Sequence, residues 1–314
     1  MAVVNSYRVL VTGGAGFIGS HIVDAAVNAG HKVAIVDNLS TGRLQNLNSA
    51  ARFYNVDITD KKALDAAFAN WQPEYVIHHA AQIDVRHSVQ DPAFDAAVNI
   101  GGSLNILHAA SQHGVRKVVY ASSAALYGDP CYLPVDEKHP VQPMAPYGAS
   151  KHTVEHYLAI YHELYGLEYT ALRYANVYGP RQDAKGEGGV VAIFTDRFLN
   201  GQGVVIYGDG EQTRDFVYVG DIAVANLLAM TADFNGILNI STEQETSVND
   251  LFQLLQTVSG RTVACTRLPE RPGEIRRSAL SNKLAQEHLN WTPRVTLHEG
   301  LQRTFSTQAQ DLGA

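Results

Sequence analysis

The chain has 314 residues, of which 46% are hydrophobic and 18% charged, and its formal net charge is −7. This composition is ordinary for a water-soluble globular protein of one large or two modest domains. The net negative charge argues against a broad surface for nucleic acid or membrane. Two distant cysteines, no secretory signal pattern and no run of about 18 apolar residues lead us to expect reduced thiols and a cytoplasmic protein.

Short β-branched runs alternate with segments of helical apolar spacing in the first half of the chain. We expect strands at residues 8–11, 32–36, 53–56, 75–78, 117–121 and 169–173, and helices at 17–29, 61–69, 94–113 and 147–164. Repeated strand–helix–strand order is typical of a parallel sheet. The expected fold class is therefore α/β, a doubly wound, Rossmann-type parallel sheet.

The alternation stops after Tyr178, where glycines and a proline indicate loops. Residues 216–219, a helix near 221–230 and residues 237–240 are expected to return to the sheet, and a further helix begins near Val248. We predict a dinucleotide-binding domain at 1–176 and 215–242. The smaller, discontinuous cap that binds substrate would comprise 177–214 and 243–314.

A glycine-rich turn joins the first expected strand to the first helix. Gly13, Gly14, Gly16 and Gly19 fit a loop that lets the backbone approach a pyrophosphate at a helix N-terminus. Asp37 ends the second strand, 18 residues after Gly19. An acid there accepts hydrogen bonds from the adenosine ribose and repels a 2′-phosphate, which favours NAD over NADP.

A second feature, Asp57-Ile58, follows the third expected strand. An adenine contact is one interpretation of it. A helix N-cap at Asp57 or Thr59 is an equally good one.

Tyr147 and Lys151 are four residues apart on an expected helix that follows Pro146, so they share one face. An ammonium group favours the phenolate form of a nearby tyrosine, which could then act as a base near neutral pH. Ser123 ends the preceding strand. A surface Tyr–Lys pair is the simpler interpretation, but the nucleotide loop favours the catalytic one.

These motifs together resemble the extended short-chain dehydrogenase/reductase family, and most closely its bacterial UDP-glucose 4-epimerases. The resemblance covers residues 8–303 and includes His79-Ala80-Ala81 and the segment from Arg173 to Pro180. It implies Tyr147 as base, Lys151 as its electrostatic and ribose partner, and Ser123 as hydrogen-bond partner of the sugar O4. On the cofactor side it implies Gly13, Gly16, Phe17, Ile18, Gly19, Asp37, Asn38, Asp57, Ile58, Ala80, Ala81 and Asn99, with Tyr147 and Lys151.

The resemblance also implies a UDP-sugar site. Asn176, Arg214 and Arg271 would contact the diphosphate and Glu274 the uridine ribose. Tyr207, Phe216 and Val248 would lie near the uracil, and Val190 would offer a backbone contact. Two segments depart from the family pattern. Where the family has a lysine this chain has Gln82-Ile83-Asp84, and where it has paired asparagines this chain has Gly188-Gly189-Val190. For Arg271 the simpler interpretation is a solvated basic run with Arg276 and Arg277.

Ser278 matches a position that gates the sugar C2 group, where a small residue admits N-acetylated sugars. The alternative is a plain loop serine with the register displaced to Ala279, also small, or to Arg277. A homodimer through 94–113 and 147–164 is a further implication. His152 and His156 have zinc-like spacing but lack the His-Glu-x-x-His pattern, so we expect no metal site.

The predicted function is NAD-dependent epimerisation at C4 of UDP-hexoses through a transient 4-keto sugar. The expected substrates are UDP-glucose and UDP-galactose, and also UDP-GlcNAc and UDP-GalNAc. Related dehydratases and decarboxylases carry an acidic residue just after the active-site Ser or Thr, and this chain has Ala124-Ala125 there. Three alternatives stay open: a UDP-glucuronate 4-epimerase, another NAD-dependent nucleotide-sugar dehydratase or decarboxylase, and a non-catalytic NAD-binding regulator.

Overall fold

The computed structural model describes residues 6–184, 189–270 and 275–313. Its larger part is built on one seven-stranded sheet in the order β11-β6-β5-β4-β1-β2-β3, in which every paired neighbour is parallel. The strands are β1 (Arg8–Thr12), β2 (Lys32–Asp37), β3 (Arg52–Asn55), β4 (Tyr75–His78), β5 (Lys117–Ser123), β6 (Glu168–Tyr174) and β11 (Gly236–Ile240). This order confirms the predicted doubly wound, Rossmann-type fold.

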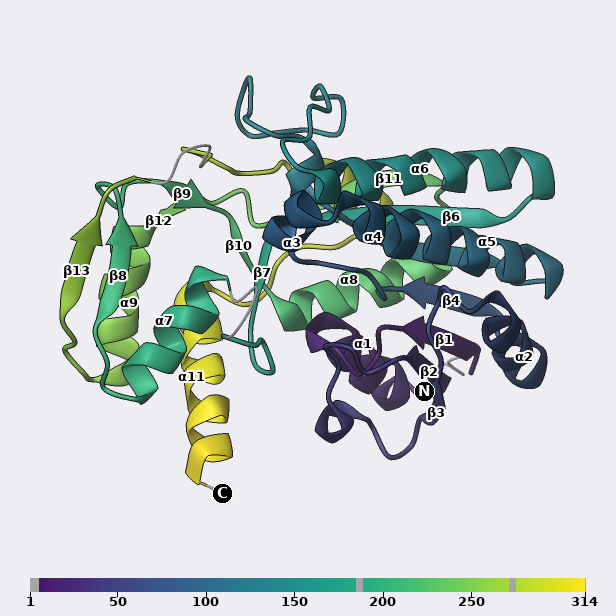
Figure 1. Cartoon of the computed structure of the whole chain (residues 1–314), viewed down its shortest axis with the longest axis horizontal. Coiled ribbons are helices and arrows are strands. Elements are labelled where there is room, and N and C mark those ends of the chain that lie inside the picture. The colour runs from purple at the N-terminus through teal and green to yellow at the C-terminus, as the bar shows by residue number, and fades with distance from the viewer. Residues whose placement is uncertain (1–5, 185–188, 271–274, 314) are drawn as a thin grey trace.

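Helices cover both faces of the sheet (Figure 1). One face carries α1 (Phe17–Asn28), α8 (Val219–Thr231) and α10 (Lys283–Leu289), and the other carries α2 (Lys61–Trp71), α5 (Ser103–Gln112) and α6 (Pro146–Tyr165). Each face buries a separate apolar core, because strands covered on both sides present apolar residues to both. Because the strands are parallel, all their carboxyl ends meet at one edge of the sheet, and sheets of this kind bind ligands at that edge.

The predicted helix over 94–113 forms, but part of it is π-helical. The structure has α3 (Val85–Gln90), α4 (Pro92–Ala96), a π-helical turn over Ala97–Gly102 and then α5. A Cβ at Gly102 would lie 2.5 Å from Ile58, so the chain passes unusually close to its neighbour there. Wide turns of this kind occur frequently at functional sites, and this one contains Asn99.

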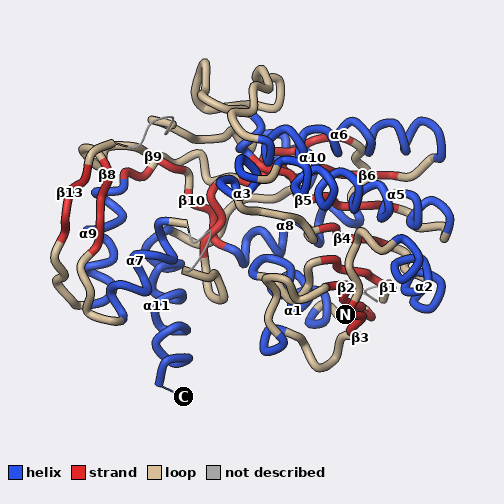
Figure 2. Tube along the Cα trace, viewed as in Figure 1, coloured by secondary structure: helices blue, strands red, loops and turns tan. Residues whose placement is uncertain are grey.

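The smaller part joins segments that are far apart in the sequence (Figure 2). Its helices are α7 (Val190–Leu199), α9 (Val248–Ser259) and α11 (Leu297–Gly313), and its strand pairs are β8 (Val204–Tyr207) with β13 (Cys265–Leu268), β9 (Thr213–Arg214) with β12 (Thr246–Ser247), and β7 (Asn176–Tyr178) with β10 (Phe216–Tyr218). A third apolar core lies among them. Two short 3-10 turns, Leu44–Asn46 and Ala124–Leu126, complete the described elements.

The prediction that residues 216–219 return to the large sheet is wrong. Residues 216–218 form β10, which among the described strands pairs with β7, and Val219 begins α8, whereas β11 does join the sheet beside β6. Phe216 and Tyr218 belong to the core of the smaller part, so their apolar contacts hold β10 there. Conversely, Leu289 and Trp291 pack in the core of the large sheet. The predicted domain boundaries stay a prediction.

No helix in the described ranges is long and apolar enough to cross a membrane. Within the same ranges, no group of three or more His, Cys, Asp or Glu side chains could hold a metal ion.

Candidate active site

The glycine turn after β1 leaves no room for side chains. Gly13 has a φ of 70°, and a Cβ there would lie 2.7 Å from the backbone nitrogen of Ala80. A Cβ at Gly19 would lie 2.1 Å from the carbonyl oxygen of Gly13. Gly16 precedes α1 and offers no side-chain cap, so the first N–H groups of the helix, at Phe17 and Ile18, can serve an anion. This cradle fits the pyrophosphate of a dinucleotide.

Asp37 lies directly beside this turn. Its carboxylate accepts hydrogen bonds from the backbone N–H groups of Ala15 at 3.0 Å and Leu39 at 2.8 Å. The side chain therefore helps to hold the turn, a role that its position at the end of β2 did not indicate. This placement suits the expected ribose contact, which stays a prediction.

The next strand end brings Asn38, Asp57 and Ile58 to the same edge. Asn38 donates to the Asp57 carboxylate at 2.7 Å, and Ile58 lies against Gly102. The N-cap of α2 is Asp60, whose carboxylate accepts from two backbone N–H groups of the first turn. The alternative that Asp57 or Thr59 caps this helix is therefore wrong, because α2 begins at Lys61, as expected, and Asp60 directly precedes it.

A threonine organises the end of β4. The Thr12 hydroxyl accepts from the N–H groups of His79 and Ala80, both at 3.1 Å, and bonds the ring of His78 at 2.7 Å. Burial is the main cause that lowers the pKa of His79 to about 4, and it lowers the pKa of His78 well below its usual value. Both rings are neutral at physiological pH, so the carboxyl end of β4, which carries Ala80 and Ala81, offers dipoles instead of charge.

The three predicted catalytic residues come from two neighbouring elements. Ser123 is the last residue of β5, and Tyr147 and Lys151 lie in the first turns of α6. The Lys151 ammonium nitrogen is 5.9 Å from the centre of the Tyr147 ring and donates to the carbonyl oxygen of Ala121 at 2.9 Å. Burial lowers the pKa of Lys151 to about 8. The arrangement places a buried cation beside a phenol.

A buried ion pair that sequence reasoning missed holds β5, β6 and α6 together. The Arg173 guanidinium donates to both oxygens of Glu155, at 2.9 and 2.7 Å, and the Ser122 hydroxyl donates to Glu155 at 2.6 Å. Both charged side chains are nearly inaccessible. The available signal was Glu155, four residues after Lys151 on the same helix.

The side-chain amide of Asn99 makes hydrogen bonds to other residues of the protein. Its oxygen accepts from the N–H of Gln82 at 2.8 Å, and its nitrogen donates to the carbonyl of Gln82 at 2.9 Å and to the Ser150 hydroxyl at 3.1 Å. It thereby ties the chain that follows Ala81 to α6. The cofactor contact predicted for Asn99 stays a prediction.

Two predicted UDP contacts, Asn176 and Arg214, lie on short strands of the smaller part. Asn176 begins β7 and donates its backbone N–H to the carbonyl of Asp215. The Arg214 guanidinium donates to the carbonyl of Ile275 at 2.8 Å, in the segment that leads to Ser278. Asp215 is fully buried and accepts from Thr242, Glu243 and Leu280. It therefore joins three segments, which local sequence patterns did not indicate.

The remaining predicted UDP contacts differ in how deeply they are buried. Phe216 and Val248 are largely buried in the smaller core, Tyr207 ends β8 half-buried, and Val190 begins α7. Ser278 is half-buried between exposed Arg277 and buried Ala279. Arg271 and Glu274 lie outside the described residues.

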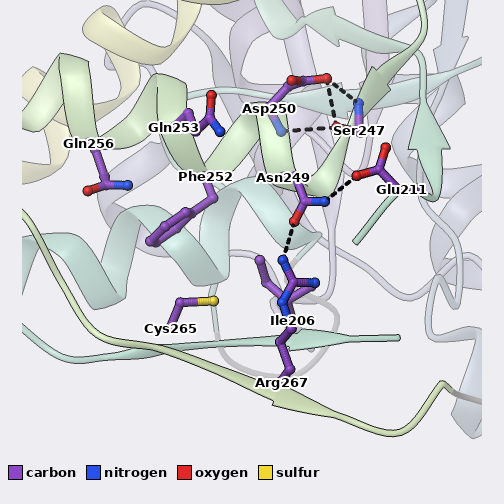
Figure 3. A pocket seen from close by; sticks show the side chains of 10 residues that line it. All are labelled: Ile206, Glu211, Ser247, Asn249, Asp250, Phe252, Gln253, Gln256, Cys265 and Arg267. Atoms are coloured by element: carbon purple, nitrogen blue, oxygen red, sulfur yellow. Dashed lines mark hydrogen bonds between the residues drawn. The ribbon is translucent and has the colours of Figure 1, made fainter. Parts of the chain in front are cut away.

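A pocket of about 750 Å³ lies between α9 and the β8–β13 pair (Figure 3). Gln253 and Gln256 line it from α9, and Cys265 and Arg267 from β13. Arg267 already donates to Asn249 at 3.0 Å. None of the predicted site residues that the structure describes lines this pocket, so it does not locate the chemistry.

Comparison with known proteins places this geometry in a family. The NAD dependent epimerase/dehydratase family matches residues 9–241, and the chain belongs to it. A UDP-glucose 4-epimerase from Thermotoga maritima, solved with UDP-glucose, is 47% identical with a TM-score of 0.95, over 97% of this chain and 99% of that one. A UDP-glucose 4-epimerase from Thermus thermophilus, solved with NAD, is 44% identical with a TM-score of 0.91, over 96% and 98%.

A third similar structure is a UDP-N-acetylglucosamine 4-epimerase from Methanobrevibacter ruminantium. It is 38% identical with a TM-score of 0.93, over 98% of this chain and 99% of that one. Membership of the family confirms the predicted resemblance, the enzyme class and NAD as the cofactor.

Proposed function

We propose that the enzyme inverts C4 of UDP-hexoses and interconverts UDP-glucose with UDP-galactose. The observation that carries this proposal is the meeting of Ser123, Tyr147 and the buried Lys151 at the sheet edge that also holds the glycine cradle. The 3-10 turn after Ser123 contains Ala124 and Ala125 and no acid. Elimination of water needs an extra proton donor, so simple epimerisation suits this site better than dehydration.

The side chains divide the work at O4. Tyr147 takes the O4 proton as base and returns it as acid, and Lys151 stabilises its phenolate. Ser123 donates a hydrogen bond that stabilises the changing charge at O4. NAD, when bound in the cradle of Gly13 and Gly16, supplies hydride transfer at C4. The diphosphate would be anchored by Arg214, Arg271 and Asn176 while the keto sugar rotates to present its opposite face.

Product analysis tests this function. Because hydride returns to the same sugar, we expect the purified enzyme to carry NAD and to release no stoichiometric NADH. The experiment incubates it with UDP-glucose, UDP-galactose, their N-acetyl counterparts and UDP-glucuronate, and identifies products by chromatography. A C4 epimer as the sole product supports the proposal. A dehydrated or decarboxylated sugar would favour a dehydratase or decarboxylase, turnover of UDP-glucuronate alone would favour a UDP-glucuronate 4-epimerase, and no turnover would favour a regulator.

We also propose that N-acetylated UDP-sugars are accepted. Ser278 is small and half-buried, and a small side chain at this position is what an acetamido group beside it requires. We expect Ser278→Tyr to lower kcat/KM for UDP-GlcNAc at least about fivefold more than for UDP-glucose, because overpacking costs about 1–3 kcal/mol. Ser278→Ala, which stays small, is the matched control. Equal losses for both substrates would refute the gate.

We further propose a cytoplasmic homodimer that pairs through α4–α6. Phe94 on α4 is 47% exposed, and Ile160 and Leu164 on α6 are 45% and 67% exposed. Such apolar side chains on neighbouring helices favour burial against a second copy. The free, exposed Cys131 and Cys265 suit a reducing compartment. Light scattering on the parent and on Ile160→Glu measures whether this face pairs.

A further inference from the structure

Asp95 on α4 is an almost fully buried acid, 1% exposed, to which no role has been assigned above. One of its oxygens accepts hydrogen bonds from the side-chain amides of Gln82 at 2.9 Å and Asn99 at 3.0 Å. These two residues hold the chain that follows β4, next to Ala80 and Ala81. A single carboxylate oxygen therefore fixes both amides at the cofactor edge.

The Lys151 ammonium has no carboxylate partner at ion-pair distance in the ranges 6–184, 189–270 and 275–313. Burial lowers the pKa of Lys151 to about 8, and the negative charge of Asp95 acts against this by favouring the protonated form of Lys151. The other titratable groups that face Lys151 or Asp95 are His78 and His79 at the end of β4, Tyr120 on β5, and Tyr147 and Glu155 on α6. Both histidines are held neutral, so Asp95 supplies the counter-charge to Lys151 outside α6.

The second oxygen of Asp95 is buried and accepts no hydrogen bond, and the buried Tyr120 hydroxyl likewise has no partner among the described residues. The Tyr120 ring centre lies 5.1 Å from the Lys151 nitrogen. An unpartnered buried carboxylate oxygen is costly and rare in native proteins. It is tolerated where the charge itself has a use.

We propose that Asp95 is a positioning residue of the active site, which holds Asn99 and Gln82 in place and keeps the Lys151 side chain charged beside Tyr147. This inference rests on the proposed function for its kinetic readout. The geometry offers a substitution that separates charge from shape. In Asp95→Asn the amide oxygen can accept both existing hydrogen bonds, and the amide nitrogen occupies the position that makes none.

Asp95→Asn tests the charge. Without the carboxylate, Lys151 loses its proton at lower pH, so the alkaline limb of kcat moves down by about one pH unit, since nearby charges shift a pKa by about 1–3 units. At about pH 8.5 the variant should lose roughly tenfold in kcat and near pH 6.5 it should approach the parent. An unmoved alkaline limb would overturn the proposal.

Matched variants complete the test. Asp91→Asn makes the same change at the exposed N-cap of α4, where Asn is an equally good cap, and should leave both limbs unmoved. Asp95→Ala, which also removes the acceptor of Asn99 and Gln82, should lower kcat at every pH. If Asp95→Ala retains parental kcat across the pH range, the positioning role is wrong.

A second readout needs no substrate. Lysine-selective NMR, with the Lys151 resonance identified by its loss in Lys151→Met, should show the titration of Lys151 about one unit lower in Asp95→Asn than in the parent. An unchanged titration would overturn the proposal even in a parent that epimerises. If the parent does not turn over UDP-hexoses, the proposed function fails, and this titration still decides the role of Asp95.

Discussion

Tyr147→Phe should lower the rate of UDP-hexose epimerisation by about 10²–10⁴, the usual cost of losing a general base. The ring keeps its place in the first turn of α6, and the backbone N–H still donates to the Ser88 hydroxyl at 3.2 Å. NAD and UDP should bind as in the parent, because the cradle of Gly13 and Gly19 is untouched. The measurement is kcat with each UDP-hexose, together with bound NAD after purification and calorimetric UDP affinity.

Tyr165→Phe is the matched control, since Tyr165 ends the same helix and is 61% exposed. It should retain parental kcat. Near-parental kcat in Tyr147→Phe would show that another group moves the O4 proton. Loss of NAD from Tyr147→Phe would show instead that the Tyr147 hydroxyl is needed for binding.

Arg173→Met should lower the free energy of unfolding by about 3–5 kcal/mol, because it leaves the Glu155 carboxylate buried without its cation. Both partners are almost inaccessible, at 3% and 2%. The variant is measured by denaturant unfolding at constant NAD, with the midpoint and slope compared to the parent. Arg303→Met breaks a half-exposed ion pair with Glu299 and should cost at most about 1 kcal/mol.

The acid dependence of the same pair has a definite sign. Burial opposes the Glu155 carboxylate, but the hydrogen bonds from Arg173, His152 and Ser122 prevail, and the pKa of Glu155 is lowered in the folded enzyme. Its contribution is therefore present above the pKa of an unfolded glutamate and is lost as the pH falls through the lowered value. If Arg173→Met and the parent had the same free energy of unfolding at neutral pH, the ion pair would orient its side chains without stabilising the fold.

The seven-stranded sheet arose from local patterns that were legible in the sequence. The six strands expected before Tyr178 all form, with small changes at their ends, because each is a short β-branched run between turns. The glycine turn and the four-residue spacing of Tyr147 and Lys151 were equally legible, since backbone clearance and helix periodicity depend on neighbours in the chain. These features were enough to place the cradle and the catalytic pair.

Only the tertiary structure decided how these elements are joined. Gln82, Asn99 and Asp95 contact one another through side-chain hydrogen bonds, as do Glu155 and Arg173 across 18 positions of the chain. The β10 strand was assigned to the wrong sheet because a strand-like run of residues does not determine which strand it pairs with. Hydrogen-bond satisfaction and charge compensation in a buried site depend on which segments meet. The sequence therefore determined which residues could do the chemistry, and the packing of the sheet edge against α4 and α6 decided which residues hold them in place.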